Sequence, residues 1–289
     1  MILPNTVIIG APKSGTSSLF FWLNAHPEVC GSRVKETFYF HDRVYPRFNK
    51  NANFIKHGLS KYPDFWSHYA QEKIILEATA QYIFLNNPLV ELSKFPSPPK
   101  IIILLREQSS RIYSLFKFNK YRLGQVEKNV SFETYIGERN NNVLEANPLA
   151  QSNYLEVIKR WDEKFGKENI LVYQFEKMQK DKVSFMKQVA LDLAIDESFY
   201  NNFDFFKRNE TRSMKNHKLH RLGLKIQPYV PQWLQEKIFV PFYLAINSSK
   251  APAITADEKE YLQRLKIEFK SSNKQLAAIY PQIDLELWK

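Results

Sequence analysis

The chain of 289 residues has one cysteine, Cys30, so no disulfide bond can form within it. A lone thiol fits a reducing compartment, in which disulfides are rare. No run of about 18 apolar residues occurs, so a membrane-spanning helix is not expected. The N-terminus enters an apolar run directly, without the pattern of a signal peptide. These absences predict a soluble, cytoplasmic protein.

Metal-binding patterns are also missing from the sequence. The six histidines are scattered, and neither an H-x-x-x-H pair nor a carboxylate-rich motif occurs, so no metal cofactor is expected. The net charge of +11 attracts polyanions in general, but the basic residues form no run of five or six. The densest basic stretch, Lys207–Lys225, fits a solvated helix face, and nucleic acid is not expected as a partner.

What the sequence does contain is an alternation of apolar runs and helical segments. Strands are predicted at residues 7–10, 73–77, 100–106 and 169–173. Helices are predicted at 15–26, 62–70, 87–94, 108–123, 153–165, 181–194 and 255–271, with a short helix before residue 281. This alternation favours one α/β domain over residues 1–289, in which helices cover both faces of a central parallel sheet.

Some local signals refine these boundaries. Ser152 is the expected N-cap of the helix at 153–165, and Thr255 with Glu258 has the spacing of a capping box. Residues 43–63 are polar, aromatic and irregular, which is typical of a lid-like loop. Four prolines within residues 224–254 favour loops with short helices there.

The most informative motif is Gly10–Ser18, which lies between the first predicted strand and the first predicted helix. A glycine-bounded turn in this position presents backbone N–H groups and a positive helix end to a phosphate. The spacing of Gly10 and Gly15 matches the nucleotide loop G-x-x-x-x-G-K-[ST], but Thr16 occupies the place of its lysine. The lysine is within the loop, at Lys13, which argues against an ordinary Mg-nucleotide hydrolase.

The string P-K-S-G-T-S-S-L resembles the 5′-phosphosulfate loop of sulfotransferases that use 3′-phosphoadenosine 5′-phosphosulfate (PAPS). The resemblance implies a P-loop NTPase-like three-layer sandwich, and the missing membrane anchor suggests a bacterial-type member. It also implies that Lys13 holds the bridging and 5′-phosphate oxygens. The 5′-phosphate is then wrapped by the residues that follow, namely Ser14, Gly15, Thr16, Ser17 and Ser18.

A second motif follows the third predicted strand, which ends at Arg106. An arginine at the carboxyl end of a parallel strand lies where open α/β sheets bind ligands. Together with Arg111 and Ser114, it resembles the sulfotransferase pattern R-[DN]-P-x-x-R-x-x-S, which clamps the 3′-phosphate of PAPS. The resemblance assigns Arg106 and Ser114 to that phosphate, which ATP lacks. Glu107-Gln108 departs from the Asn/Asp-Pro of the family.

Sulfuryl transfer to a hydroxyl needs a cation at the leaving phosphate, an aligned acceptor and a group that takes the proton. Lys13 suits the first role. Lys35-Glu36 opens a segment that resembles the K-E-x-x-[FY]-F stretch of heparan sulfate and related carbohydrate sulfotransferases, in which the glutamate is taken as the base. Glu36 is therefore the preferred base, with His41 and Glu77 as alternatives.

The segment Glu77–Tyr82 is similar to E-K-[ST]-x-x-Y of the glycan-modifying enzymes. Ala78 replaces the lysine of that pattern, which the resemblance assigns to donor binding or to activation of the base. Lys35 is a candidate substitute for it and a candidate substrate-binding residue. Ser152 and Tyr154 match the S-x-Y that opens a helix near the acceptor in the same families.

A late segment, Asn209–Lys215, resembles N-x-[ST]-x-x-x-[RK], which folds over the adenosine and the 3′-phosphate. By this resemblance Lys215 contacts the donor, and Arg212 is the second choice.

The sequence thus predicts a PAPS-dependent sulfotransferase that modifies a hydroxyl or an amine of a glycan or lipid-linked acceptor and releases 3′,5′-ADP. One alternative is a P-loop kinase or NTPase, which needs lysine in place of Thr16 and a strand that ends in aspartate rather than Arg106. Another is a non-catalytic polyanion-binding module, which fits the +11 charge but requires neither a base nor a 3′-phosphate clamp.

Overall fold

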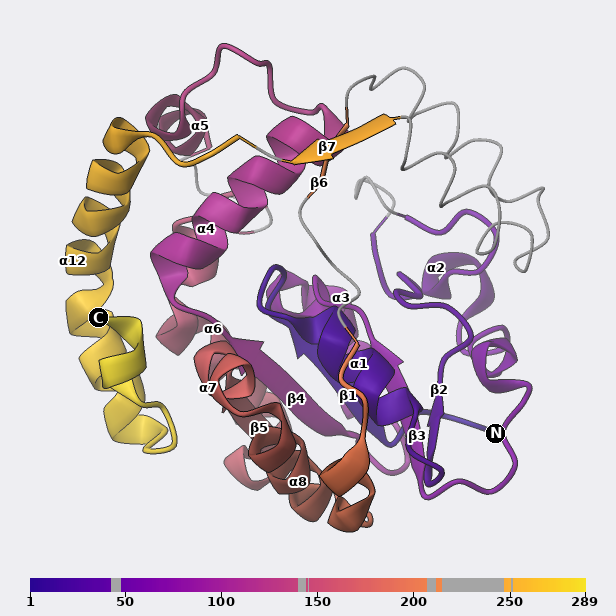
Figure 1. Ribbon diagram of the computed structural model, residues 1–289. Coiled ribbons are helices and arrows are strands. Elements are labelled where there is room, and N and C mark those ends of the chain that lie inside the picture. Colours follow the sequence, from indigo (N-terminus) through magenta and orange to yellow (C-terminus); the bar gives the residue numbers. More distant parts are fainter. Residues whose placement is uncertain (43–47, 140–143, 145, 207–211, 215–246, 251) are drawn as a thin grey trace.

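The computed structural model describes residues 1–289 except 43–47, 140–143, 145, 207–211, 215–246 and 251 (Figure 1). Within these residues a parallel sheet has the strand order β2-β3-β1-β4-β5. Its strands are β1 (Thr6–Gly10), β2 (Val29–Gly31), β3 (Ile74–Ala78), β4 (Lys100–Leu105) and β5 (Ile170–Gln174). A separate antiparallel pair consists of β6 (Arg212–Met214) and β7 (Ser248–Lys250).

Helices connect and cover these strands. They are α1 (Thr16–Asn24), α2 (Phe54–His57), α3 (Asn86–Ser93), α4 (Gln108–Lys117), α5 (Phe132–Glu138), α6 (Tyr154–Phe165), α7 (Phe175–Lys180), α8 (Lys182–Asp192) and α12 (Ala256–Ile279). A π-helical segment, Phe118–Leu123, continues α4. No helix in the described parts of the chain is both long and apolar enough to cross a membrane.

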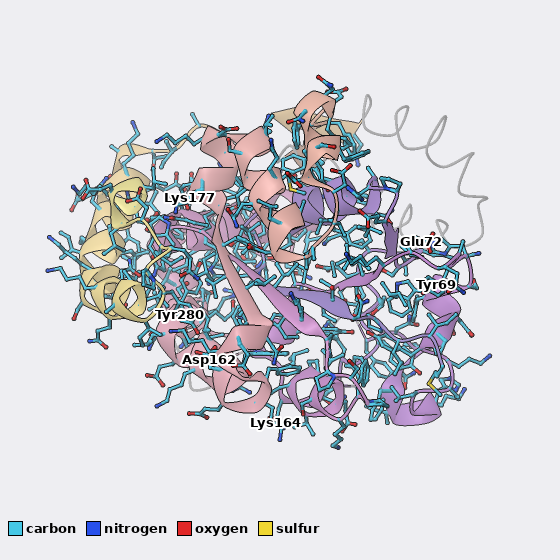
Figure 2. All side chains as sticks on the ribbon, turned by 90° about the horizontal axis from the view of Figure 1, so that it is seen from below. Tyr69, Glu72, Asp162, Lys164, Lys177 and Tyr280 are labelled. Atoms are coloured by element: carbon cyan, nitrogen blue, oxygen red, sulfur yellow. The ribbon has the colours of Figure 1, made fainter. Side chains whose placement is uncertain are left out.

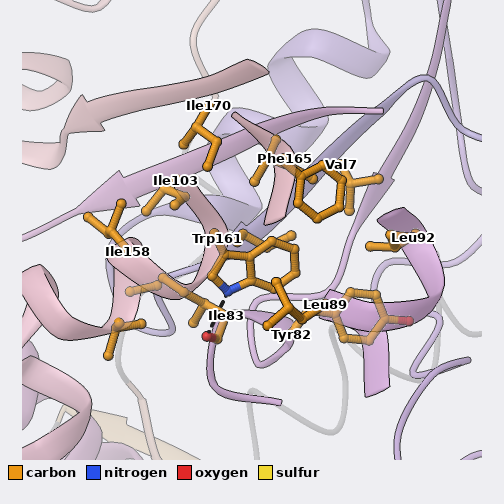
Figure 3. Packing of buried hydrophobic residues seen from close by; sticks show 14 of the residues in the cluster. Val7, Tyr82, Ile83, Leu89, Leu92, Ile103, Ile158, Trp161, Phe165 and Ile170 are labelled. Atoms are coloured by element: carbon orange, nitrogen blue, oxygen red, sulfur yellow. Dashed lines mark hydrogen bonds between the residues drawn. The ribbon is translucent and has the colours of Figure 1, made fainter. Parts of the chain in front are cut away.

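One face of the sheet packs against α3 and α6. Alternate residues of the strands, such as Val7 and Ile103, point to this face, as expected for a strand period of two. They meet Leu89 of α3 and Trp161 of α6 in a fully or largely buried cluster (Figure 3). The Trp161 indole also donates to the carbonyl of Ile83 (3.1 Å), so its one polar group is satisfied within the core.

The other face packs against α1 and α8. Ile8 and Ile102, the neighbours of Val7 and Ile103 in sequence, point to this side and meet residues such as Leu19 of α1 and Val189 of α8. With helices on both faces, the described chain has the three-layer α/β architecture that its strand and helix pattern predicts.

The strand order places a topological switch point between β1 and β4. After β1 the chain passes through α1 to the β2 side of the sheet, whereas after β4 it passes to β5 on the opposite side. In open α/β sheets, ligands bind in the crevice at such a point, beyond the carboxyl ends of the strands. Both sequence motifs, Gly10–Ser18 and Arg106–Ser114, follow these two strands.

The C-terminal region packs back onto the sheet layers. α12 begins with the predicted capping box, in which the Thr255 side chain accepts from the amide of Glu258 and the Glu258 side chain accepts from the amide of Thr255. At its other end the Tyr280 hydroxyl donates to Asp162 of α6, and the Lys177 ammonium donates to the carbonyl of Gln282 (2.7 Å) (Figure 2).

Several predicted boundaries are wrong. The region predicted as a helix at 62–70 contains one 3-10 turn, Pro63–Trp66, because the Trp66 indole is bonded to Leu76 of β3 and the chain turns back toward that strand. The two helices predicted after residue 255 form one continuous helix that ends at Ile279. The residues next to Asn273 have poor helix propensity, but Asn273 donates to the Gln108 side chain (3.1 Å), and this tertiary contact stabilises the helix there.

Other elements escaped prediction because they are short. β2 has three residues, too few for an alternation to be visible, and α5 has seven. The region 43–63 contains α2, and residues 43–47 of it lie outside the described residues, as does most of 224–254.

Candidate functional site

The loop between β1 and α1 is shaped by Gly15. This residue precedes α1 with φ of 92°, in the left-handed region that side chains rarely adopt. A Cβ at this position would lie 2.6 Å from Met178 Cε and 2.8 Å from the ring of Phe175. α7 therefore packs directly against the loop, and only glycine fits the contact.

The start of α1 has the properties of an anion site. No side chain caps the helix, and its first turn contains no acidic residue, so its unpaired N–H groups and positive end suit an anion. The hydroxyl of Ser14 is fully buried and has no hydrogen-bond partner among the described residues. An orphaned donor at a helix N-terminus fits a phosphate, which accepts several hydrogen bonds at once.

Lys13 is held at both ends. Its carbonyl accepts a hydrogen bond from Nη1 of Arg106 (3.1 Å), and its ammonium lies 4.0 Å from the centre of the Phe118 ring. A cation over an aromatic face gains about 0.5–2 kcal/mol, depending on its exposure. Phe118 begins the π-helical segment that continues α4. The helix that carries the Arg106–Ser114 motif therefore also contacts Lys13 through this segment.

Arg106 connects several elements at the carboxyl edge of the sheet. Its guanidinium lies 4.9 Å from the centre of the Phe175 ring while it donates to the loop, and its own carbonyl accepts from the Tyr154 hydroxyl (2.7 Å). Burial lowers the pKa of Arg106, and the nearby carboxylate of Glu176 opposes this effect. The arginine remains cationic, because its ordinary pKa is far above neutrality.

Glu107 stands where the sulfotransferase pattern that this motif resembles has Asn or Asp, and it fixes the turn after Arg106. It is the N-cap of α4, and its carboxylate accepts from the amides of Ser109 (2.8 Å) and Ser110 (2.9 Å). Its own amide donates to Oε1 of Glu176 (2.9 Å). The turn that positions Arg106 is therefore fixed by two glutamates.

Arg111 and Ser114 lie on successive turns of α4. Ser114 is half-buried, whereas Arg111 is fully buried and donates through Nη2 to Ser152 Oγ (2.6 Å) and to the carbonyl of Pro148 (3.1 Å). The predicted N-cap role of Ser152 is wrong: Asn153 is the N-cap of α6, and the Ser152 hydroxyl donates to Pro148 (2.8 Å).

The sequence predicts that Ser152 and Tyr154 contact an acceptor. Both are at most 1% exposed, and their hydroxyl groups are engaged with Arg111 and with the carbonyl of Arg106. Burial raises the pKa of Tyr154 to about 12.

Glu36 lies beyond the carboxyl end of β2, beside the end of β3. Its Oε1 accepts from the backbone amide of Ala80 (3.1 Å) and lies 3.4 Å from the ammonium of Lys35. The Glu36 side chain keeps 13% of its surface exposed and that of Lys35 keeps 6%. A carboxylate in this position is oriented and still accessible.

Glu77, an alternative base, is fully buried at the end of β3. Its two oxygens accept from three hydroxyl groups, those of Thr37 (2.6 Å), Thr79 (2.8 Å) and Tyr62 (2.5 Å). Burial raises the pKa of Glu77, and these donors oppose the shift. His41, the other alternative, is also fully buried, with its ring packed against Phe38 and Tyr82.

The late motif is described only in part. Lys215 lies outside the described residues, and so do residues 209–211. The backbone of Arg212 begins β6, which pairs with β7 and lies against the π-helical segment after α4. β6 thus passes close to the helix that carries Ser114, at the top of Figure 1.

Sequence reasoning missed three residues of this site: Phe118, Phe175 and Glu176. Phe175 and Glu176 directly follow β5, so their position at the carboxyl edge of the sheet was the signal that could have identified them. Among the described residues, no group of three or more His, Cys, Asp or Glu side chains could hold a metal ion.

Comparison with known proteins identifies relatives of this chain. A family model described as "Sulfotransferase domain" matches residues 3–230. A membrane-associated sulfotransferase, kil1, of Dictyostelium discoideum is 29% identical over 166 residues, which are 55% of this chain and 33% of that protein. Mouse heparan sulfate glucosamine 3-O-sulfotransferase 3A1 is 28% identical over 112 residues, which are 39% of this chain and 25% of that protein.

The alignments therefore span about a third or less of these two relatives. Among solved structures, a sulfotransferase from Alicyclobacillus acidocaldarius superimposes with a TM-score of 0.61 at 21% identity, over 79% of this chain and 93% of that one. This likeness supports the fold.

The packing around Gly15 gives a stability prediction. Replacement Gly15→Ala should lower the free energy of unfolding by about 2 kcal/mol, since the methyl group meets α7 and the left-handed backbone is strained. Gly137→Ala is the matched control, because a methyl group added there would have no heavy atom within 4 Å, and it should be neutral or stabilising by up to about 1 kcal/mol. Urea unfolding measures both, and equal effects would contradict the packing argument.

Proposed function

The chain belongs to the sulfotransferase family, since the domain model matches most of its length, and we propose that it transfers a sulfuryl group from PAPS to a hydroxyl or amine. The acceptor proposed is a glycan or lipid-linked glycan. The observation that carries the proposal is the hydrogen bond from Arg106 to the carbonyl of Lys13, because it joins the two phosphate motifs at one edge of the sheet.

The donor supplies an activated sulfuryl group and a phosphate leaving group. The residues present fit its two phosphate ends. Lys13, the buried hydroxyl of Ser14 and the first amides of α1 suit the 5′ side, where Thr16, Ser17 and Ser18 lie. Arg106 and Ser114 suit the 3′-phosphate, with Arg212 and Lys215 proposed to contact it from the late segment.

The chemistry follows from where charge moves. The acceptor oxygen forms a bond to sulfur as the bond from sulfur to the bridging phosphate oxygen breaks in line, and the electron pair stays on that oxygen. The Lys13 ammonium neutralises this growing charge, an effect that is strongest where water is excluded. The proton of the acceptor passes to the Glu36 carboxylate.

Burial and hydrogen bonding favour Glu36 over the other candidate bases. Glu36 is partly exposed, and the Ala80 amide and Lys35 orient it, so an acceptor proton can reach it. Glu77 is fully buried, and both of its oxygens are already engaged by hydroxyl donors. His41 is fully buried between aromatic rings. Lys35, beside Glu36, is proposed to take part in acceptor binding in place of the lysine that Ala78 replaces.

Nucleotide binding tests the proposed donor. With 3′,5′-ADP in hundredfold excess over Kd, the folded state should gain about 2.7 kcal/mol, whereas 5′-ADP should give a smaller gain and ATP-Mg²⁺ little. Thermal unfolding with each nucleotide measures this order. A gain with ATP-Mg²⁺ alone would favour a kinase or NTPase, and no gain with any of them would favour a polyanion-binding module.

Replacement of the loop lysine tests the first motif. Lys13→Ala should reduce transfer of labelled sulfate from PAPS to a glucosamine-containing oligosaccharide by at least about 100-fold, because the leaving oxygen loses its cation. The melting temperature should stay close to that of the wild type. Lys164→Ala, which removes an exposed lysine of α6, is the matched control and should keep full activity. Full activity of the Lys13 variant would exclude its assigned role.

Two glutamine variants distinguish the candidate bases. Glu36→Gln should retain binding of 3′,5′-ADP and lose at least about 100-fold in turnover, since an amide cannot take the proton. Glu77→Gln should keep most of the turnover, because an amide oxygen can still accept from Thr37 and Thr79. The reverse result in the same transfer assay would assign the base to Glu77.

A further inference from the structure

The peptide unit between Arg106 and Glu107 is held on both sides. Its carbonyl accepts from the Tyr154 hydroxyl (2.7 Å), and its N–H donates to Oε1 of Glu176 (2.9 Å). A peptide plane fixed by two partners cannot rotate without breaking one of them, so the direction in which the Arg106 side chain leaves the backbone is also fixed. Tyr154 therefore acts on the guanidinium of Arg106 through the backbone.

A second set of bonds fixes α4. Arg111 donates through Nη2 to Ser152 Oγ (2.6 Å) and to the carbonyl of Pro148 (3.1 Å), and the Ser152 hydroxyl donates to the same carbonyl (2.8 Å). Ser114 lies three residues after Arg111, on the same side of the helix. The rotation of α4 about its axis, and with it the direction of Ser114, depends on this anchor.

The charge of Arg111 is incompletely satisfied. Its side chain is fully buried, and Nε and Nη1 have no hydrogen-bond partner among the described residues. Burial lowers the pKa of Arg111, and the nearby hydroxyl of Tyr154 opposes this effect. A buried cation without a carboxylate is costly, and a nearby dianion relieves that cost.

We infer that Arg111, Ser152 and Tyr154 form a buried brace that positions Arg106 and Ser114 and thereby sets the preference of this chain for a nucleotide with a 3′-phosphate. They are positioning residues, and Ser152 and Tyr154 do not contact the acceptor, since both are at most 1% exposed. The inference rests on the proposed function, because it concerns the donor site assigned there.

The experiment measures the dissociation constants of 3′,5′-ADP and 5′-ADP by calorimetry, without any acceptor. The variants are Tyr154→Phe and Ser152→Ala, which each remove one hydroxyl, and Arg111→Lys, which keeps the charge but loses the planar fork. Tyr200→Phe is the matched control, because the Tyr200 hydroxyl is also buried and also donates to a backbone carbonyl, that of Trp22 (3.1 Å).

The quantity of interest is the ratio of the Kd for 5′-ADP to the Kd for 3′,5′-ADP. Tyr154→Phe and Ser152→Ala should lower this ratio about three- to tenfold, the effect of one hydrogen bond, and Arg111→Lys at least as much. Tyr200→Phe should leave it unchanged. Melting temperatures without ligand and retained affinity for 5′-ADP report that each variant is folded.

The outcomes distinguish failure of the brace from failure of the proposed donor preference. If the wild type prefers 3′,5′-ADP and the three brace variants keep its full preference, the inference is overturned and the proposed function stands. Equal weakening of both nucleotides would also overturn it, because it indicates general loss of structure. If the wild type binds both nucleotides equally, the proposed function fails, and the inference fails with it.

Discussion

The proposed donor site depends on the parallel pairing of β1 with β4. The two strands end side by side, and the amide of Ala11 donates to the carbonyl of Leu104 (2.9 Å), so the pairing extends into the loop that follows β1. Because the chain leaves these strands in opposite directions, their carboxyl ends form a topological switch point, where open α/β sheets bind ligands. Lys13 and Arg106 meet there, although they are far apart in the sequence.

The buried charged groups on the two sides of this switch point have different hydrogen-bond partners. On the β3 side, Glu77 accepts from three hydroxyl groups. Burying a carboxylate costs several kcal/mol, and each hydrogen bond to a charged group contributes about 1.5–3 kcal/mol, so the three donors offset a large part of this cost. The pKa of Glu77 remains raised, because burial is the larger effect. On the α4 side, Nη2 of Arg111 donates to Ser152 and Pro148, whereas its Nε and Nη1 have no hydrogen-bond partner among the described residues.

The arrangement around Glu77 also orders the candidate base. Thr37 follows Glu36 in sequence, and Thr79 precedes Ala80, whose amide donates to Glu36. Both threonines donate to the buried carboxylate of Glu77. Glu77 therefore fixes the backbone next to Glu36 and the backbone next to Ala80. Glu77 therefore supports the backbone around Glu36, and Glu36 is the proposed base.

The sequence predicted the features that are local in the chain. The apolar run of β4, the glycine-bounded loop and the capping box at Thr255 each carry their signal in a few consecutive residues. The contacts that Phe175 and Tyr154 make with Arg106 could not be predicted in this way, since they arise where α7 and α6 pack against Arg106. Ser152 shows the limit most clearly: its position suggested a helix cap, but the bond to Arg111 depends on tertiary structure.

The strand pairing has a consequence for the order in which the protein can assemble during synthesis. Thr6 of β1 is in register with Leu76 and with Lys100, so the first strand has no partner in the sheet until these later strands have been made. Such distant contacts are slow to form. Glu176, which holds the turn at Glu107, is itself bonded to the indole of Trp288 (2.8 Å). The proposed nucleotide site therefore gains this support only after Trp288 has been synthesised.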